Sequence, residues 1–401
     1  ISTPILILLL VGSLAGSWLL SGIIPSMIYY GFKIINASFF LPACIIICAI
    51  TSFATGSSWS TSATVGIALI GIGKVLGFET GMVAGAVISG AYFGDKMSPL
   101  SDTTNLAAAV TESNLFDHIK YMMITTFPTI VITFIFFLLF NIFNLPNEGI
   151  TNQNYVELIP DFFNTSPVLF LVPLFVIILI IKKVNPVIAL FLGTILAAIF
   201  SLLFQNDIIV GIIKNNPEQD LNEYMVIMNS IIGETNIDTN ISFLDELLSS
   251  NGMAGMLDTV WLVICAMVFG GVMDGIGALK KISLTLLSFA KSTLSLFANT
   301  VFSCLTVNVT ASDQYLSIVI PGKMYSEAYK ERGLASVNLS RTIEDSGTVT
   351  SVLIPWNTCG AYQSEVLNVS VWDYFIYAIF NWLSPITTLI IAYLKFKIKK
   401  A

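Results

Sequence analysis

Long apolar runs separated by short polar segments extend along the whole chain. Continuous apolar stretches predict helices at roughly 4–30, 118–143, 168–181, 185–204, 256–278 and 371–394. Several of these stretches approach about 20 residues, the length that an α-helix needs to cross roughly 30 Å of hydrocarbon. The pattern therefore predicts an all-α polytopic membrane protein.

Four other stretches are apolar but carry polar residues at their centres. The stretches 80–112 and 334–364 are long enough to span a membrane, yet carboxylates, Ser, Thr, Gly and Pro interrupt them. The stretches 38–75 and 293–330 are too long for one crossing and are polar in the middle. Irregular backbone at this depth must be covered by protein or line a water-filled cavity. We therefore predict two interrupted transmembrane helices and two re-entrant hairpins.

Composition narrows the class of protein. Hydrophobic residues make up 55% of the chain and charged residues only 11%, whereas about a quarter of a soluble globular domain is charged. A disordered chain and an ordinary soluble enzyme are therefore excluded. The net charge is −7 and no block of basic residues is present, so the expected partner is the lipid bilayer rather than nucleic acid.

The charge distribution predicts the orientation. Cytoplasmic loops of membrane proteins are enriched in Lys and Arg, so the Lys-rich segment 395–400 is placed inside. Counting crossings back from it puts the acidic stretches 144–166 and 205–255 outside and most of the 18 Lys and Arg residues inside. This layout requires each hairpin to return to the side from which it enters. Both termini of the full-length protein are then expected in the cytoplasm.

Landmarks recur in the same order in the two halves of the chain. Polar hairpin tips fall at 51–64 and 305–317, and polar centres of interrupted helices fall at 95–109 and 344–361. The first hairpin is expected to open outside and the second inside. The two repeats are therefore predicted to be inverted, as in many secondary transporters.

The predicted domains follow from this repeat. Residues 1–143 form the first inverted repeat, 144–167 an outer linker, and 168–401 the second inverted repeat. The second repeat begins with two helices that have no counterpart in the first. We therefore expect the first repeat to lack its first two helices, which would precede residue 1 in the full-length protein.

Carboxylates at predicted membrane depth are the first candidates for chemistry. They are Asp95, Asp102, Asp274, Asp313, Glu344 and Asp345. A charge at the centre of a bilayer costs at least about 2.5–3.5 kcal/mol on insertion scales, so such residues are functional candidates by default. The structural alternative is an ion pair, of Asp95 with Lys96 or of Glu344 with Arg341.

Oxygen-rich clusters surround several of these carboxylates. Pro99 lacks an N–H group and frees backbone carbonyls. The eight residues at 98–105 offer many further oxygens, from Ser98, Ser101, Asp102, Thr103, Thr104 and Asn105. Oxygen ligands suit a hard cation, whereas the positive ends of half-helices would suit an anionic substrate group. Hydroxyls that bind helices together explain single Ser or Thr residues but not such runs.

The candidate ion- and substrate-binding residues come from both halves. They are Gly56, Ser57, Ser58, Thr61, Asp95, Ser98, Ser101, Asp102, Thr103, Thr104, Asn105, Asn308, Thr310, Asp313, Glu344, Asp345, Thr348, Asn357 and Thr358. The Na⁺ ligands expected among them are Asp102, Asn105, Ser57, Asp313 and Asn357. We expect Asp102 to exchange a proton for Na⁺. If Asp102 only caps a helix, Asp95, Glu344 or Asp345 carries the proton instead.

Three segments resemble a known family. They are ATGSSWSTSATVG (54–66), SGAYFGDKMSPLSDTTNLAAAV (89–110) and GTVTSVLIPWNTCGAY (347–362), and they look like the NhaC-type Na⁺/H⁺ antiporter family of the ion transporter superfamily, whose relatives include malate/lactate exchangers. The resemblance implies a multi-pass protein of the bacterial inner membrane. It also implies Na⁺ and H⁺ as coupling ions without a cofactor, and a scaffold and a transport domain that move in an elevator-like way, often within a homodimer.

Several functions remain open at this point. The main prediction is a secondary Na⁺/H⁺ antiporter that works by alternating access. The alternative is Na⁺-coupled transport or exchange of a small carboxylate or amino acid, such as malate or lactate. An intramembrane aspartyl protease is a distant alternative, because Tyr92-Phe93-Gly94-Asp95 lacks the first glycine of the Gly-x-Gly-Asp motif. A channel is disfavoured because the polar residues of the two halves differ, whereas channels favour symmetric rings.

Overall fold

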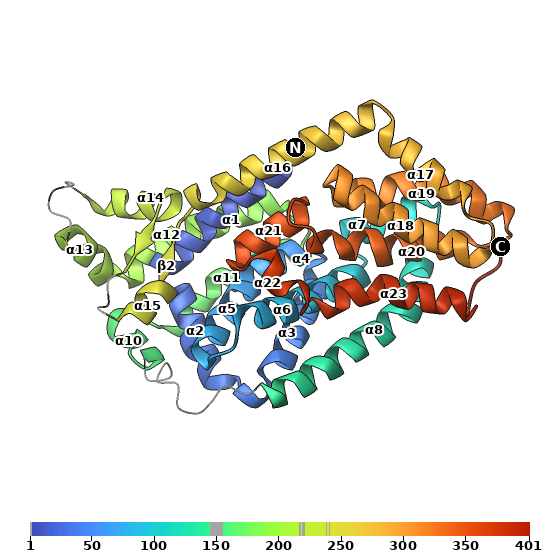
Figure 1. Ribbon diagram of the computed structural model, residues 1–401. Coiled ribbons are helices and arrows are strands. Elements are labelled where there is room, and N and C mark those ends of the chain that lie inside the picture. Colours follow the sequence, from blue (N-terminus) through green and yellow to red (C-terminus); the bar gives the residue numbers. More distant parts are fainter. Residues whose placement is uncertain (1, 145–154, 216–217, 219–220, 238, 240) are drawn as a thin grey trace. The chain divides into compact units, whose positions relative to one another are not determined.

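Helices account for nearly all of the regular structure of the protein (Figure 1). A computed structural model describes residues 2–144, 155–215, 218, 221–237, 239 and 241–401. Within these residues one small sheet departs from the predicted all-α fold, in which β1 (Thr235–Asn236) pairs antiparallel with β2 (Ser249–Ser250). The coarse prediction of a helical protein is confirmed.

Six helices in the described residues are long and apolar enough to cross a membrane. They are Ala37–Thr55, which includes α3 (Phe40–Thr55), Ser58–Leu76, α8 (Leu115–Phe143), α12 (Pro186–Phe204), Ala254–Gly275, which includes α16 (Leu257–Gly275), and α18 (Thr293–Ala311). Large apolar side chains stay exposed along them, as Phe127 on α8 and Trp261 on α16 illustrate. Such a surface is suited to lipid rather than to water.

One compact unit comprises Ile1–Phe40, Ala63–Val83 and Asn141–Trp261. Its long helices are α1 (Ser2–Leu20), α2 (Ile23–Ile34), α5 (Ile67–Leu76), α11 (Leu171–Ile181), α12 and α14 (Glu223–Ile232). Its shorter elements are α10 (Ile159–Phe162), η3 (Pro167–Phe170), α13 (Asn206–Asn215), α15 (Ser242–Leu247) and η5 (Ala254–Met256). Helix α1 packs against α12 and α14, and α2 packs against α5.

The predicted helix at 4–30 is wrong in one respect, because the chain bends by 71° between α1 and α2. Gly22 takes the left-handed conformation at the bend, with φ at 77°. A bend leaves carbonyls without their helical partners. Gln205 satisfies one of them, because its Nε2 donates to the Ser21 carbonyl at 3.1 Å. The partner lies far along the sequence, so local pattern did not predict this bend.

The second compact unit comprises Leu41–Ser62, Ala84–Phe140 and Leu262–Ala401. Besides α3, α8, α16 and α18, its helices are α4 (Ser58–Thr61), α6 (Thr80–Met97), α7 (Asp102–Val110), α17 (Ala278–Ser288), α19 (Gln314–Glu331), α20 (Ser336–Ile343), α21 (Thr358–Leu367), α22 (Val371–Phe375) and α23 (Ile379–Tyr393). Helix α19 packs against α18, α20 and α7 around a core that includes Phe297, Tyr325 and Ile343. Each unit thus combines elements of both predicted repeats.

The predicted helix at 371–394 is two helices, α22 and α23. The reason is a close backbone approach between distant segments. A Cβ atom on Gly85 of α6 would overlap Tyr377, which lies in the break between α22 and α23. Close contact of this kind needs a glycine on one side, and the break lets the chain at Tyr377 lie directly on α6.

The interruptions expected at 80–112 and 334–364 are confirmed. Helix α6 ends at Met97 and α7 begins at Asp102. In the second half α20 continues into a π-helical turn, η6 (Glu344–Thr348), and then into η7 (Ser351–Leu353), before α21 begins at Thr358. The polar segments at 51–64 and 305–317 break their helices as well. The first of them contains part of the π-helical turn η2 (Ser62–Gly66).

Candidate ion-binding site

The first polar break lies directly against the first interrupted helix. Gly56 follows α3 with φ at 70°, and a Cβ there would lie 2.7 Å from the backbone of Leu100, between α6 and α7. The Asp95 carboxylate on α6 accepts hydrogen bonds from the Ser58 N–H (3.1 Å) and the Ser58 hydroxyl (2.7 Å). Asp95 therefore joins α6 to the first turn of α4.

The second polar break repeats this contact in the other half. The Asn308 Nδ2 on α18 donates to the Gly347 carbonyl at 2.7 Å, and the Asn357 Nδ2 donates to the Asn308 carbonyl at 3.1 Å. The Thr358 N–H donates to the Ser312 carbonyl at 3.0 Å. Each polar break thus contacts the interrupted helix of the same half within this unit.

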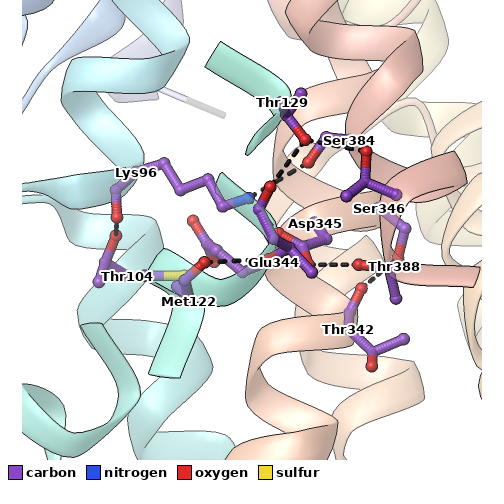
Figure 2. A network of polar contacts seen from close by, with 12 residues as sticks. Lys96, Thr104, Met122, Thr129, Thr342, Glu344, Asp345, Ser346, Ser384 and Thr388 are labelled. Carbon is purple, nitrogen blue, oxygen red and sulfur yellow. Dashed lines mark hydrogen bonds and ion pairs between the residues drawn. The ribbon is translucent and has the colours of Figure 1, made fainter. Parts of the chain in front are cut away.

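A buried ion pair joins the two interrupted helices (Figure 2). The Lys96 ammonium at the end of α6 contacts the Asp345 carboxylate of η6, and both side chains are 0% exposed. Lys96 also donates to the Ser384 hydroxyl at 3.2 Å, while the Thr388 hydroxyl donates to Asp345. Lys96 therefore pairs with Asp345 and not with Asp95, its neighbour in sequence. The alternative that Asp95 and Lys96 pair with each other is wrong.

Glu344 lies next to this pair on η6 and is also fully buried. Its Oε1 accepts a hydrogen bond from the Thr103 hydroxyl of α7 at 3.1 Å. Its Oε2 has no hydrogen-bond partner among the residues that the structure describes. Arg341 does not reach it, because the Arg341 guanidinium lies over the Tyr121 ring, 4.7 Å from its centroid. The alternative pairing of Glu344 with Arg341 is therefore not formed in this structure.

Charge balance follows from these contacts. Lys96 neutralises Asp345, whereas neither Asp95 nor Glu344 has an ion-pair partner within the described parts of the chain. Burying a carboxylate without a counter-charge costs several kcal/mol by order of magnitude. A proton or a bound cation removes that cost. The site can therefore hold protons or cations on carboxylates whose neighbours supply hydroxyl and amide groups.

The candidate residues differ in how far they are exposed to solvent. Those buried in this unit are Ser58, Thr61, Asp95, Ser98, Ser101, Thr103, Thr104, Asn308, Glu344, Asp345, Thr348, Asn357 and Thr358. Those partly exposed are Gly56, Ser57, Thr310 and Asp313, and those exposed are Asp102 and Asn105. Asp274, at the end of α16, is exposed as well.

The five expected Na⁺ ligands do not form one cluster by their own contacts. Ser57 caps α4, Asp313 caps α19 and Asn357 caps α21, each through a side-chain oxygen that accepts a backbone N–H. Asn105 donates to the Pro99 and Ser101 carbonyls at 3.0 and 2.6 Å. Asp102 lies in the first turn of α7, where Ser101 is the cap. No hydrogen bond or ion pair within the described chain joins any two of the five.

Sequence reasoning missed the contribution of α23. Ser384 and Thr388 complete the surroundings of the Lys96–Asp345 pair (Figure 2). Thr387 of the same helix accepts a hydrogen bond at 3.0 Å from Thr129 on α8. The sequence signal that could have indicated this contribution is the group of polar residues in an otherwise apolar helix. A stack of Trp59 on Tyr362, with ring centroids 4.0 Å apart, was also missed.

Comparison with known proteins decides the family. Residues 90–396 match the model of the Na⁺/H⁺ antiporter family. The chain belongs to this family. It is 36% identical to the Na⁺/H⁺ antiporter NhaC of Alkalihalophilus pseudofirmus, over 98% of this chain and 82% of that protein. The identity to the Bacillus subtilis NhaC is 35%, over 98% and 84% of the two chains.

A further relative has another substrate in its name. The chain is 36% identical to the malate-2H⁺/Na⁺-lactate antiporter of Bacillus subtilis, over 95% of this chain and 78% of that protein. The family predicted from the three sequence motifs is thus confirmed. This Na⁺/H⁺ antiporter family member is a multi-pass membrane transporter, not an intramembrane protease.

Proposed function

We propose that this protein exchanges Na⁺ for H⁺ across the bacterial inner membrane by alternating access. The observation that carries the proposal is Glu344, a fully buried carboxylate with one unpartnered oxygen beside the Lys96–Asp345 pair. A carboxylate in such a place can be neutralised by a proton or by Na⁺, but the two compete for the same negative charge. Each ligand then weakens the binding of the other by the same factor.

The neighbours of Glu344 have different roles in this proposal. Lys96 and Asp345 form a fixed neutral pair that holds α6 against η6. Thr103 supplies a hydroxyl at 3.1 Å from α7, which begins after the interruption. Asp95 is a second buried carboxylate without an ion-pair partner in the described chain. We assign the proton and the ion to Glu344 first and to Asp95 second.

The residues of the two breaks are proposed to contribute Na⁺ oxygen ligands along the path. Asp102 and Asn105 are exposed, so they are accessible from outside their unit. Ser57, Asp313 and Asn357 keep further lone pairs after capping their helices. In this proposal Asp102 acts in ion access, which departs from its expected role as the exchanging carboxylate.

The inverted-repeat architecture is part of the proposal. Similar local geometry at the two breaks supports it. Gly56 and Ser312 both have positive φ, at 70° and 58°, and the next residue caps the following helix in each case. We propose repeats at 1–143 and 168–401 joined by a linker at 144–167, of which 145–154 lie outside the described residues.

The hairpins are proposed to be re-entrant, with the Lys-rich segment 395–400 in the cytoplasm. The arms of the first hairpin, Ala37–Thr55 and Ser58–Leu76, are each 19 residues long, and labelling at their outer ends tests whether both open on the same side. An elevator-like movement of one unit and assembly as a homodimer complete the proposal.

Exchange of a small carboxylate or amino acid is the second candidate function. Arg341 favours it, because its guanidinium is fully buried and has no hydrogen-bond partner among the described residues. Buried guanidinium groups commonly bind carboxylates. The malate-2H⁺/Na⁺-lactate relative supports this candidate too.

The two functions can be separated with purified protein in liposomes that contain a pH-sensitive dye. Pulses of NaCl, LiCl or KCl are applied with and without malate, lactate or amino acids. We expect NaCl alone to drive proton movement, with a half-saturating Na⁺ concentration that rises as pH falls, because protons compete for the carboxylate. Proton movement that requires an organic substrate would favour the second candidate and contradict pure cation exchange.

A further inference from the structure

Arg341 is an unusual buried charge. Its side chain is 0% exposed, and Nε, Nη1 and Nη2 all lack hydrogen-bond partners in the part of the chain that the structure describes. Its guanidinium lies over the Tyr121 ring, 4.7 Å from the ring centroid. A desolvated cation–π contact stabilises by about 2 kcal/mol, whereas an unpaired buried charge costs several kcal/mol by order of magnitude. The contact with Tyr121 therefore does not offset the cost of burial.

Glu344 is the matching unsatisfied charge of opposite sign. Its Oε2 is buried and unpartnered, as described above. Arg341 and Glu344 are three residues apart, with Arg341 in the last turn of α20 and Glu344 at the start of η6. Residues at this spacing have Cβ atoms about 5–6 Å apart. This spacing places the long Arg341 side chain and Glu344 on the same side of the helix, so that a rotamer change of Arg341 is the movement that the pairing requires.

The helix at this point also departs from regular α geometry. The π-helical turn η6 starts at Glu344 itself. Single π-helical turns inside α-helices are frequently found at functional sites. Tyr121, which holds Arg341 in the present position, is fixed by hydrogen bonds to Asn338 and to the Lys397 carbonyl. The Arg341 guanidinium therefore has two binding positions available. It lies over the Tyr121 ring in this structure, and the unpartnered Glu344 Oε2 offers the second.

We propose that Arg341 is the internal counter-cation of Glu344, and that the two form an ion pair when Glu344 carries neither Na⁺ nor a proton. This proposal rests on the proposed role of Glu344 in exchange. Arg341 acts through Glu344 and is a positioning residue. Na⁺ must displace the guanidinium in order to bind, so Arg341 weakens Na⁺ binding and helps release the ion.

The first test measures half-saturating Na⁺ in liposomes for Arg341→Gln and Arg341→Lys. The pH is set well above the range in which wild-type half-saturation depends on pH, so that proton competition is negligible. We expect Arg341→Gln to lower half-saturating Na⁺ about tenfold, within the usual range of coupling between sites. Arg341→Lys keeps the positive charge and should stay close to wild type.

Arg332→Gln is the matched control. Arg332 is a partly buried Arg of the same unit whose guanidinium donates to the Ala328 and Ala290 carbonyls. Its loss should lower thermal stability without changing half-saturating Na⁺. Unchanged half-saturation in a folded Arg341→Gln protein would overturn the proposal, and so would the same shift in Arg332→Gln.

The second test does not depend on transport. Melting temperatures of wild type, Arg341→Gln, Glu344→Gln and the double variant form a cycle, recorded without Na⁺ and at saturating Na⁺ at the same alkaline pH. We expect coupling between the two positions without Na⁺ and little coupling with it. Absence of coupling in both conditions would contradict the proposed ion pair. Stabilisation of the wild type by chloride that is lost in Arg341→Gln would also contradict it, because that result would assign the guanidinium to a bound anion.

The failures of the two proposals are distinguishable. Normal exchange by Glu344→Gln contradicts the proposed function of that carboxylate. If Glu344→Gln abolishes exchange but Arg341→Gln leaves the half-saturating Na⁺ concentration unchanged, only the role of Arg341 is contradicted.

Discussion

Lys96 is the residue on which the charge balance of the site depends. It lies next to Asp95 in sequence, yet its ammonium contacts Asp345, far along the chain. Asp95 instead bonds to Ser58. Sequence alone placed all of these groups at membrane depth, but their partners come from different helices. The buried carboxylates of the site were candidates from the sequence, whereas their pairing and the contribution of Ser384 and Thr388 were not predicted.

Removal of one partner of the buried pair should be costly. Lys96→Gln or Asp345→Asn leaves one buried charge without compensation, and we expect a loss of about 3–5 kcal/mol in stability. The double variant should be more stable than either single variant. Thermal unfolding in detergent measures these changes. Lys330→Gln is the control, because Lys330 and Glu112 form an exposed pair whose loss should leave the melting temperature near wild type. Single variants as stable as this control would contradict the importance of the buried pair.

At the scale of elements, breaks in helices position the site. Pro99 and the polar residues around it predicted the interruption between α6 and α7, because the local sequence disfavours a continuous helix there. The bend at Gly22 and the break at Tyr377 were not predicted. Each depends on a distant group, Gln205 in the first case and Gly85 in the second. Local pattern therefore finds breaks that have local causes and misses those imposed by packing.

Gly56 gives a test at this scale. Its φ of 70° is strained for any residue with a side chain, and an added Cβ would lie 2.7 Å from Leu100. We expect Gly56→Ala to destabilise the protein by about 1–3 kcal/mol and to reduce exchange, since the break carries Ser58, the partner of Asp95. Gly271→Ala, at a helical position with nothing within 4 Å, is the control and should leave exchange unchanged without lowering stability. Normal activity and stability of Gly56→Ala would contradict a tight fit at the break.

At the scale of the whole molecule, the orientation depends on the charge distribution. Acidic residues gather in 205–255, whereas Lys residues gather near Lys281 and at 395–400. Each compact unit combines segments from both proposed repeats. The sequence predicted a helical, polytopic transporter of this family because hydropathy and motifs are local properties. The assignment of segments to units depends on contacts between distant helices, and so it was not available from local pattern.

Cysteine labelling tests the orientation. Cys265 is exposed and is replaced first, because the other described cysteines are buried. A cysteine at Glu223, which is exposed, should react with a membrane-impermeant maleimide added to intact cells. A cysteine at Lys330 should react only in inside-out vesicles. Reaction of both positions from the same side would contradict the proposed topology.

The proposed exchange of Na⁺ and H⁺ at Glu344 can be tested by comparing this buried carboxylate with the exposed carboxylate of Asp102. Na⁺-induced pH change is recorded in liposomes for Glu344→Gln and Asp102→Asn at matched amounts of folded protein. Both variants remove a negative charge and keep the size of the side chain. We expect Glu344→Gln to abolish Na⁺-driven proton movement, while Asp102→Asn retains it with a higher half-saturating Na⁺ concentration. Normal exchange by Glu344→Gln, with exchange abolished in Asp102→Asn, would contradict the role of Glu344 and return the exchanging role to the exposed carboxylate of α7.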